Sequence, residues 1–122
     1  MGYTVVEADA VERVPDRPCE LRGIGAAAGL ERAALNRYAA DPGEQLPLTY
    51  HYHDTQEEAF YVLSGELHVE TPDGTHVVPE DGLFVADPGS PHRAFNPADA
   101  DTPVEVLALG APPADDVHAH EP

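Results

Sequence analysis

The sequence of 122 residues contains no lysine and no tryptophan, and it has only one cysteine and one methionine. All six basic residues are arginine, against 23 aspartate and glutamate residues, and the formal net charge is −17. Polyanions repel so acidic a chain, which argues against nucleic acid or an anionic membrane as a partner. The lone Cys19 cannot form a disulfide within the chain, so we expect it to have no role in function.

The sequence also lacks any apolar run long enough to span a membrane, and its N-terminus has no basic region followed by an apolar one. We therefore expect a cytoplasmic protein. The acidic residues are spread through the predicted turns, which favours adaptation to a salt-rich cytoplasm such as that of a halophile. A binding surface for a basic partner is the alternative explanation of the same charge.

Short β segments separated by Pro and Gly turns run through most of the chain, whose length fits a single domain. Gly65 closes a tight turn in which glycine takes a positive φ, and Pro72-Asp73-Gly74 forms another turn. Closely spaced short strands of this kind predict an all-β jelly roll or barrel. The predicted strands cover residues 3–6, 49–53, 59–63, 66–71, 75–78, 83–86, 92–95 and 104–109.

Residues 30–40 carry conflicting signals. Leu30, Ala34 and Tyr38 are spaced as on one face of a helix, and the segment has high helical propensity. Taken alone, this stretch predicts a helix that ends before the turn at residues 41–43.

Two histidines one residue apart, His51 and His53, open the most informative stretch of the chain. Alternate side chains of a strand share a face, so both imidazoles point the same way. Glu58 follows on the next predicted strand, and His92 lies further on. A His-x-His pair alone also occurs by chance on surface strands. Three imidazoles and one carboxylate, however, suit a divalent transition metal (Fe, Mn, Ni, Co, Cu or Zn), whereas Ca and Mg prefer oxygen ligands.

This stretch resembles the first motif of the cupin superfamily, G-x5-H-x-H-x3,4-E-x6-G. The chain matches the motif from His51 through Glu58 to Gly65. Only the leading glycine departs from the pattern, because seven residues rather than five lie between Gly43 and His51.

A second stretch resembles the second cupin motif, G-x5-P-x-G-x2-H-x3-N. Gly82, Pro88, His92 and Asn96 fit it, with a middle section one residue shorter than the family pattern. We expect Asn96 to fix a turn rather than to bind metal. Two motifs in order, at a separation near the short end for the family, are specific for the fold and much less specific for an activity.

The resemblance implies a small cupin with a double-stranded β-helix, or jelly-roll barrel, over residues 31–110. An N-terminal strand and loop segment, 1–30, would pack on the barrel, and 111–122 would form a polar C-terminal tail. The resemblance also implies a strand within residues 30–40, and we predict a strand there. It implies a small-molecule ligand in the barrel and a metal held by His51, His53, Glu58 and His92.

Strand periodicity assigns faces to the segment that carries Glu58. If Glu58 points inward, so do Phe60 and Val62, while Tyr61 faces outward. Both faces are apolar, which favours a homodimer in which a partner covers the outer face. If Glu57 were the ligand, the faces would reverse; the family spacing selects Glu58 and leaves Glu57 at the rim.

The remaining histidines are weaker candidates. We expect His68 and His76 on the surface beside the hairpin at residues 72–74. His118 and His120 form a second His-x-His pair in the Pro-rich tail, where they would be solvated or part of a lid, and we assign no metal to them. Arg93 should face away from the site and pair with surface acid.

Three functions fit these features. The first is a metal-dependent enzyme of dioxygenase type, which needs no further acid or base, or an isomerase, which would need one. The second is a small-molecule or metal binding module without turnover. The third is a structural dimeric barrel with a structural metal. Fold alone does not decide among them.

Overall fold

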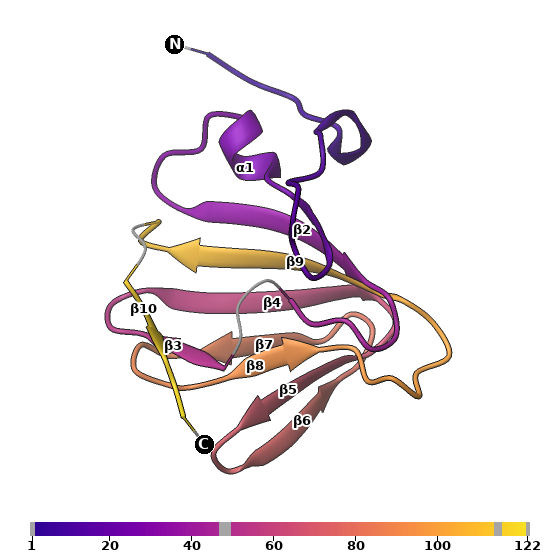
Figure 1. Cartoon of the computed structure of the whole chain (residues 1–122). Helices are drawn as coiled ribbons and strands as arrows, with labels where there is room; N and C mark the ends of the chain where they lie inside the picture. Colours follow the sequence, from indigo (N-terminus) through magenta and orange to yellow (C-terminus); the bar gives the residue numbers. More distant parts are fainter. Residues whose placement is uncertain (1, 47–49, 114–115, 122) are drawn as a thin grey trace.

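The computed structural model describes residues 2–46, 50–113 and 116–121, and its regular structure is almost entirely β strand (Figure 1). The predicted all-β fold class is therefore confirmed. Among the described residues, no helix has the length and apolar character needed to cross a membrane. The elements are η1 (Ala8–Ala10, a 3₁₀ helix), β1 (Glu20–Arg22), α1 (Ile24–Ala27), β2 (Ala34–Ala40), β3 (His51–His53), β4 (Glu57–Ser64), β5 (Leu67–Thr71), β6 (Gly74–Val78), β7 (Leu83–Ala86), β8 (Arg93–Phe95), β9 (Val104–Ala111) and β10 (Val117–Ala119).

The strands form antiparallel sheets around one core (Figure 1). One sheet has the order β1-β2-β9-β4-β7, a second has the order β6-β5-β8, and β10 pairs with β3. An isolated bridge between His51 and His92 joins β3 to the start of β8. This arrangement is the jelly-roll barrel predicted from the sequence.

Alternation along β4 and β9 explains why these strands form the centre of the larger sheet. Phe60 and Val62 on β4 lie opposite Ala108 and Val106 on β9, and all four side chains are buried. Full burial of a large apolar side chain contributes about 1.5–3 kcal/mol. Tyr61 points outward, as the periodicity predicted.

The N-terminal segment differs from its prediction. Residues 3–6, predicted as a strand, form none, and the side chains of Tyr3 and Val5 are 92% and 94% exposed. The first strand is instead β1, which pairs with β2. The prediction of a strand from this short apolar run was therefore wrong. Tyr3 and Val5 are exposed to solvent and do not pack against a sheet.

Cys19 lies directly before β1 and is buried. Its side chain belongs to the core cluster that includes Ala40 and Phe60. Burial, reinforced by the negative charges of Glu44 and Glu20, raises the pKa of the Cys19 thiol to about 12. The thiol is therefore a packed apolar group rather than a reactive one.

The ambiguous segment 30–40 forms a strand from Ala34 onward, as the cupin resemblance implied. β2 pairs with β9 along its whole length and with β1 on its other edge. Hydrogen bonding on both edges outweighs the local helical preference. For the strand predicted at 49–53, β3 begins at His51, and Thr49 lies outside the described residues.

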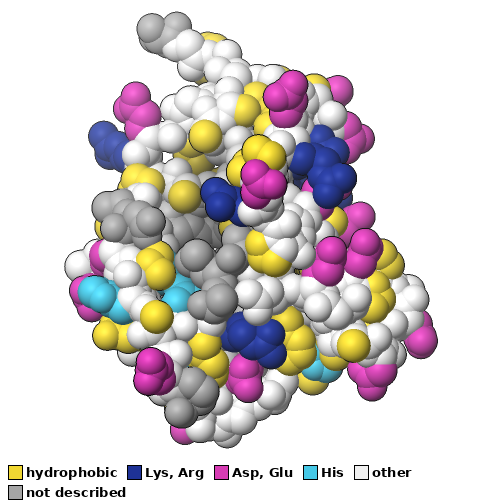
Figure 2. Space-filling view, viewed as in Figure 1, with side chains coloured by type: hydrophobic (Ala, Val, Ile, Leu, Met, Phe, Trp, Pro, Cys, Tyr) yellow, Lys and Arg dark blue, Asp and Glu magenta, His cyan; other side chains and the backbone are white. Residues whose placement is uncertain are grey.

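Acidic side chains are scattered over the visible face of the molecule rather than gathered in one patch (Figure 2). The acidic residues, which are spread along the sequence, are therefore also spread over that face of the molecule. The predicted adaptation to high salt stays a prediction.

Gly65 occupies the turn between β4 and β5 with a φ of +79°, as predicted. A Cβ at this position would lie 2.5 Å from the carbonyl oxygen of Pro103. Gly29 has the same φ of +79°, but no atom lies within 4 Å of the position its Cβ would take. A comparison of substitutions at these two glycines therefore distinguishes the cost of a left-handed backbone from the cost of a close contact.

We expect Gly29→Ala to lower the free energy of unfolding by about 1–2 kcal/mol, the cost of a left-handed backbone. Gly65→Ala should lower it by roughly 1–3 kcal/mol more, because the turn must also move away from Pro103. Urea unfolding followed by circular dichroism measures both values. Equal losses in the two variants would show that the close approach to Pro103 has no energetic effect.

Candidate metal centre

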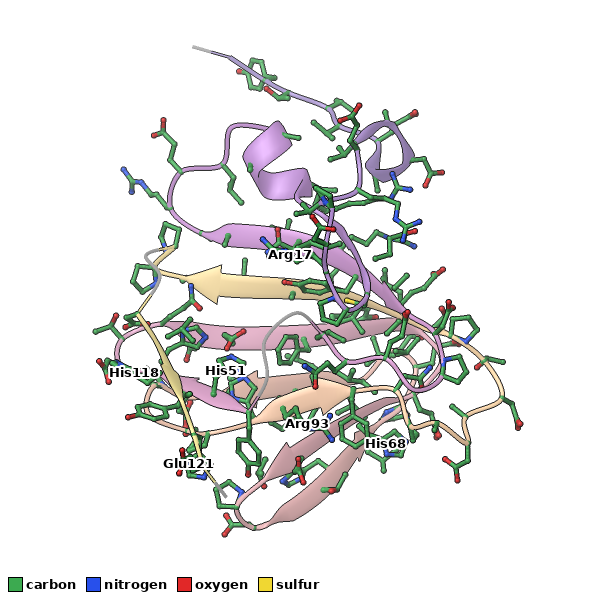
Figure 3. All side chains as sticks on the ribbon, viewed as in Figure 1. Arg17, His51, His68, Arg93, His118 and Glu121 are labelled. Carbon is green, nitrogen blue, oxygen red and sulfur yellow. The ribbon has the colours of Figure 1, made fainter. Side chains whose placement is uncertain are left out.

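The candidate ligands come from three neighbouring segments of the barrel. β3 places His51 and His53 on one buried face, β4 supplies Glu58, and His92 directly precedes β8. His92 is 1% exposed, and the other two imidazoles are 5% exposed. Figure 3 shows His51 inside the barrel, between β3 and β4.

One oxygen of Glu58 lies at the centre of the cluster. Glu58 Oε1 is 3.2 Å from His51 Nε2, 2.7 Å from His53 Nε2 and 3.0 Å from His92 Nε2. The ligand atoms of His51, Glu58 and His92 all lie within 4.8 Å of one another. These three residues therefore form a buried group that can hold a metal ion. His53 lies at the edge of this group and contacts the same oxygen.

The Nε2 atom of His53 is buried and makes no hydrogen bond among the described residues. Its contact with Glu58 Oε1 is short, but it lacks the alignment of a hydrogen bond. A buried polar atom without a partner is costly. A metal ion that accepts the Nε2 lone pair would remove this cost, so the residues present fit a metal.

His92 is held in the form that binds metal through Nε2. Its Nδ1 donates a hydrogen bond of 2.9 Å to the carbonyl oxygen of Ser90, which leaves Nε2 facing Glu58. Burial by itself lowers the pKa of His92, but the hydrogen bonds with Glu58 and Ser90 outweigh it and raise that pKa. Without a metal, His92 thus tends to hold a second proton where the ion would bind.

Glu58 is ionised at neutral pH. Burial by itself raises the pKa of its carboxyl group, but hydrogen bonds from His51 and His92, with the nearby charge of His92 and His53, lower it to about 2. A buried carboxylate needs a positive charge beside it, either a protonated imidazole or a cation. A divalent ion meets this need and leaves the imidazoles neutral.

Two cavities are each lined by two or more residues of the cluster. A cavity of about 220 Å³ lies beside His53 and Glu58, with the side chains of Asn36 and Gln56 in its wall. A smaller one of about 30 Å³ lies beside His51, His92 and Glu58, and it can hold a water molecule. Tyr38 lines both cavities. Among the described residues, no arginine lines either cavity.

Tyr38 is a polar group at the site that the sequence did not reveal as such. Asn36 Nδ2 donates a hydrogen bond of 3.4 Å to the Tyr38 hydroxyl group. Burial and the negative charge of Glu58 outweigh this hydrogen bond and raise the pKa of Tyr38 to about 12. The phenol therefore keeps its proton at neutral pH and can donate a hydrogen bond. In the sequence it counted only as an apolar position in an ambiguous segment.

Several other predictions about side chains are confirmed. Glu57 is exposed at the start of β4, so Glu58 is the carboxylate in the cluster. Arg93 pairs with Glu70 at 3.0 Å, away from the cluster. Asn96 donates hydrogen bonds to the carbonyl oxygens of Ala40 and Thr102, which fixes the turn.

The other histidines lie outside the cluster. His76 is exposed as predicted, whereas His68 is half-buried beside Phe95. His118 is in strand β10 rather than in a loose tail, and its Nε2 lies 2.7 Å from Asp54 Oδ2. The C-terminal segment contacts the cluster through Asp116, a residue that no sequence pattern singled out.

The fold and the cluster define a class of protein: a small jelly-roll barrel with buried imidazoles around one carboxylate. Residues 36–110 match the cupin domain family, and the chain belongs to that family. Its structure is similar to a sugar phosphate isomerase of the cupin superfamily from Silicibacter pomeroyi, with a TM-score of 0.82 and 21% identity over 98% of this chain and 83% of that one.

Two further proteins extend the comparison. The structure is similar to the polyketide cyclase RemF of Streptomyces resistomycificus, with a TM-score of 0.81 and 19% identity over 99% of this chain and 87% of that one. A stretch of 46 residues is 48% identical to an oxidoreductase of Arthrobotrys oligospora, and it covers 37% of this chain and 18% of that protein. The chain therefore matches less than a fifth of that relative's length. The two structural likenesses are evidence for the fold alone, and the three names denote three chemistries.

Proposed function

We propose that this cupin binds one divalent transition metal through His51, His53, Glu58 and His92. The observation that carries the proposal is that three Nε2 atoms lie 2.7–3.2 Å from one oxygen, Glu58 Oε1. The unbonded Nε2 of His53 supports it further. Three neutral imidazoles and one carboxylate favour Fe, Mn, Co, Ni, Cu or Zn.

We expect the protein, purified in high salt without chelator or nickel affinity resin, to contain about one such ion per chain. His51→Ala and His92→Ala should each lose the ion, because each removes a ligand from a small set. His76→Ala is the matched control, since His76 is exposed. Elemental analysis by mass spectrometry measures the content. If the parent holds no metal and both variants fold equally well, the metal-site proposal is wrong.

We propose that the site acts on a small uncharged molecule that presents two neighbouring oxygen atoms. Four protein ligands leave two positions on an octahedral ion. The cavity of about 220 Å³ beside His53 admits a small molecule, and its described lining offers the amides of Asn36 and Gln56 but no cation for a phosphate or carboxylate. Tyr38 would donate a hydrogen bond to a substrate oxygen.

A dioxygenase-like activity is the first candidate reaction. A redox-active ion would supply the electron transfer, so the protein itself would bind the substrate, orient it and exclude water. The partial match to an oxidoreductase supports this choice. The Tyr38 hydroxyl group, as a hydrogen-bond donor to a substrate oxygen, favours isomerisation or cyclisation as the second candidate.

Nitric oxide is a stand-in for dioxygen that tests for an open position on the ion. We expect Fe(II)-loaded protein to bind it and give the electron paramagnetic resonance signal of a high-spin iron nitrosyl. Adding catechols or 1,3-diketones should change this signal and start oxygen consumption. No signal with a fully loaded site would exclude the dioxygenase-like activity and leave metal binding intact. A ligand-induced thermal shift without turnover would indicate a binding module.

We propose that the outer face of the five-stranded sheet is a homodimer interface. Val85, Ala59 and Leu109 are cross-strand neighbours there, and a second row contains Leu83 and Tyr61. Four of these five side chains are exposed hydrophobics, all but Ala59. A contiguous apolar stripe on so acidic a chain is a surface that a second copy would cover, with the exposed Glu57 at its edge.

Val85→Glu should convert the dimer to a monomer, because it buries a carboxylate within this stripe, on the edge strand β7. Val77→Glu is the matched control: Val77 is 52% exposed on β6 of the other sheet, against 49% for Val85, and the charge change is the same. Light scattering coupled to size-exclusion chromatography measures both masses. A parent that is monomeric, or a dimer that survives Val85→Glu, would contradict the interface.

A further inference from the structure

The C-terminal segment lies against the strand that carries two of the proposed ligands. β10 is antiparallel to β3, with Val117 opposite His53 and Ala119 opposite His51. Val117 and Pro113 also line the cavity beside His53. The segment is thus part of the wall of the site, although Asp116 follows His53 by 63 positions in the sequence.

Asp116, directly before β10, contacts the ring of His53. Its Oδ1 accepts a hydrogen bond of 3.2 Å from His53 Nδ1. Its other oxygen, Oδ2, accepts hydrogen bonds of 2.7 Å from the Thr55 backbone N–H and 2.6 Å from the Thr55 hydroxyl group. The carboxylate is therefore held from both sides, with one oxygen left for the imidazole.

A carboxylate cannot donate a hydrogen bond, so His53 must carry its proton on Nδ1. The Nε2 lone pair of a neutral His53 then points to the cluster, where Nε2 lies 2.7 Å from Glu58 Oε1. Histidines that bind metals commonly donate their other N–H to a carboxylate or carbonyl group, which fixes the ring and increases its basicity. Ser90 does this for His92 through its carbonyl oxygen.

We propose that Asp116 is a positioning residue of the metal centre, which sets the Nδ1–H form of His53 and thereby couples docking of residues 116–121 to metal binding. The inference rests on the proposed function, because it takes His53 as a ligand. The coupling is reciprocal: a bound ion stabilises the docked segment, and the docked segment strengthens binding of the ion.

Other contacts hold the segment without touching the cluster, and they provide a matched control. His118 Nε2 lies 2.7 Å from Asp54 Oδ2, and its ring stacks on Tyr52 at 5.1 Å. Figure 3 shows His118 at the outer side of the barrel, whereas His51 lies within it. His118→Ala therefore loosens the segment while Asp116 keeps its contact with His53.

The experiment measures zinc affinity by chelator competition in the full chain. We expect Asp116→Ala to weaken binding by roughly 10–100-fold and His118→Ala by about threefold or less. Asp116→Asn retains an oxygen acceptor for His53 Nδ1–H and should recover part of the loss. In a His53→Ala background, Asp116→Ala should cause no further loss, because Asp116 acts through that ring. Equal losses in Asp116→Ala and His118→Ala, or an undiminished loss without His53, would overturn the proposal.

A second measurement needs no variant. The ¹⁵N chemical shifts of the His53 ring report its tautomer, which should be Nδ1–H in both the metal-free and the zinc-loaded protein. An Nε2–H tautomer in the metal-free protein would overturn the role of Asp116 even if every variant misfolds. If the parent protein binds no zinc while His53 is in the Nδ1–H form, the proposed function fails and the Asp116 contact stands.

Discussion

The site depends on keeping one ionised carboxylate inside an apolar barrel. Glu58 is surrounded by three imidazoles, and hydrogen bonds from two of them hold its pKa at about 2 despite burial. Such a charge is tolerable only beside a positive one. A protonated His92, whose pKa is raised, satisfies this need, or a metal ion satisfies it. A metal ion and a proton therefore compete for Nε2 of His92.

The barrel provides this environment because its register is fixed at a few points. The bridge between His51 and His92 holds these two residues side by side, and Glu58 on β4 of the five-stranded sheet contacts both of their side chains. Each residue lies on a strand or at its end, where a shift of one residue would turn its side chain to the other face. The apolar alternation that builds the core is thus the same constraint that points the ligands inward.

The sequence predicted the cluster and most of the strands, since both follow from local periodicity and from the spacing of two motifs. His51, Glu58 and His92 lie together as expected, and Gly65 takes the predicted positive φ. The sequence did not predict the docking of β10 or the role of Tyr38. Both depend on pairing between distant segments, for which a single sequence carries no local signal. The strand predicted at residues 3–6 was wrong because a short apolar run does not show whether a sheet lies beside it.

The buried thiol described at the start of β1 gives the molecule an internal reporter. Cys19 packs in the barrel core, its pKa is about 12, and the chain has no second thiol. A thiol reagent at neutral pH meets neither an exposed sulfur nor a thiolate until the N-terminal segment separates from the barrel. The rate at which this one sulfur reacts therefore reports how often the N-terminal segment opens, and no label has to be introduced into the protein.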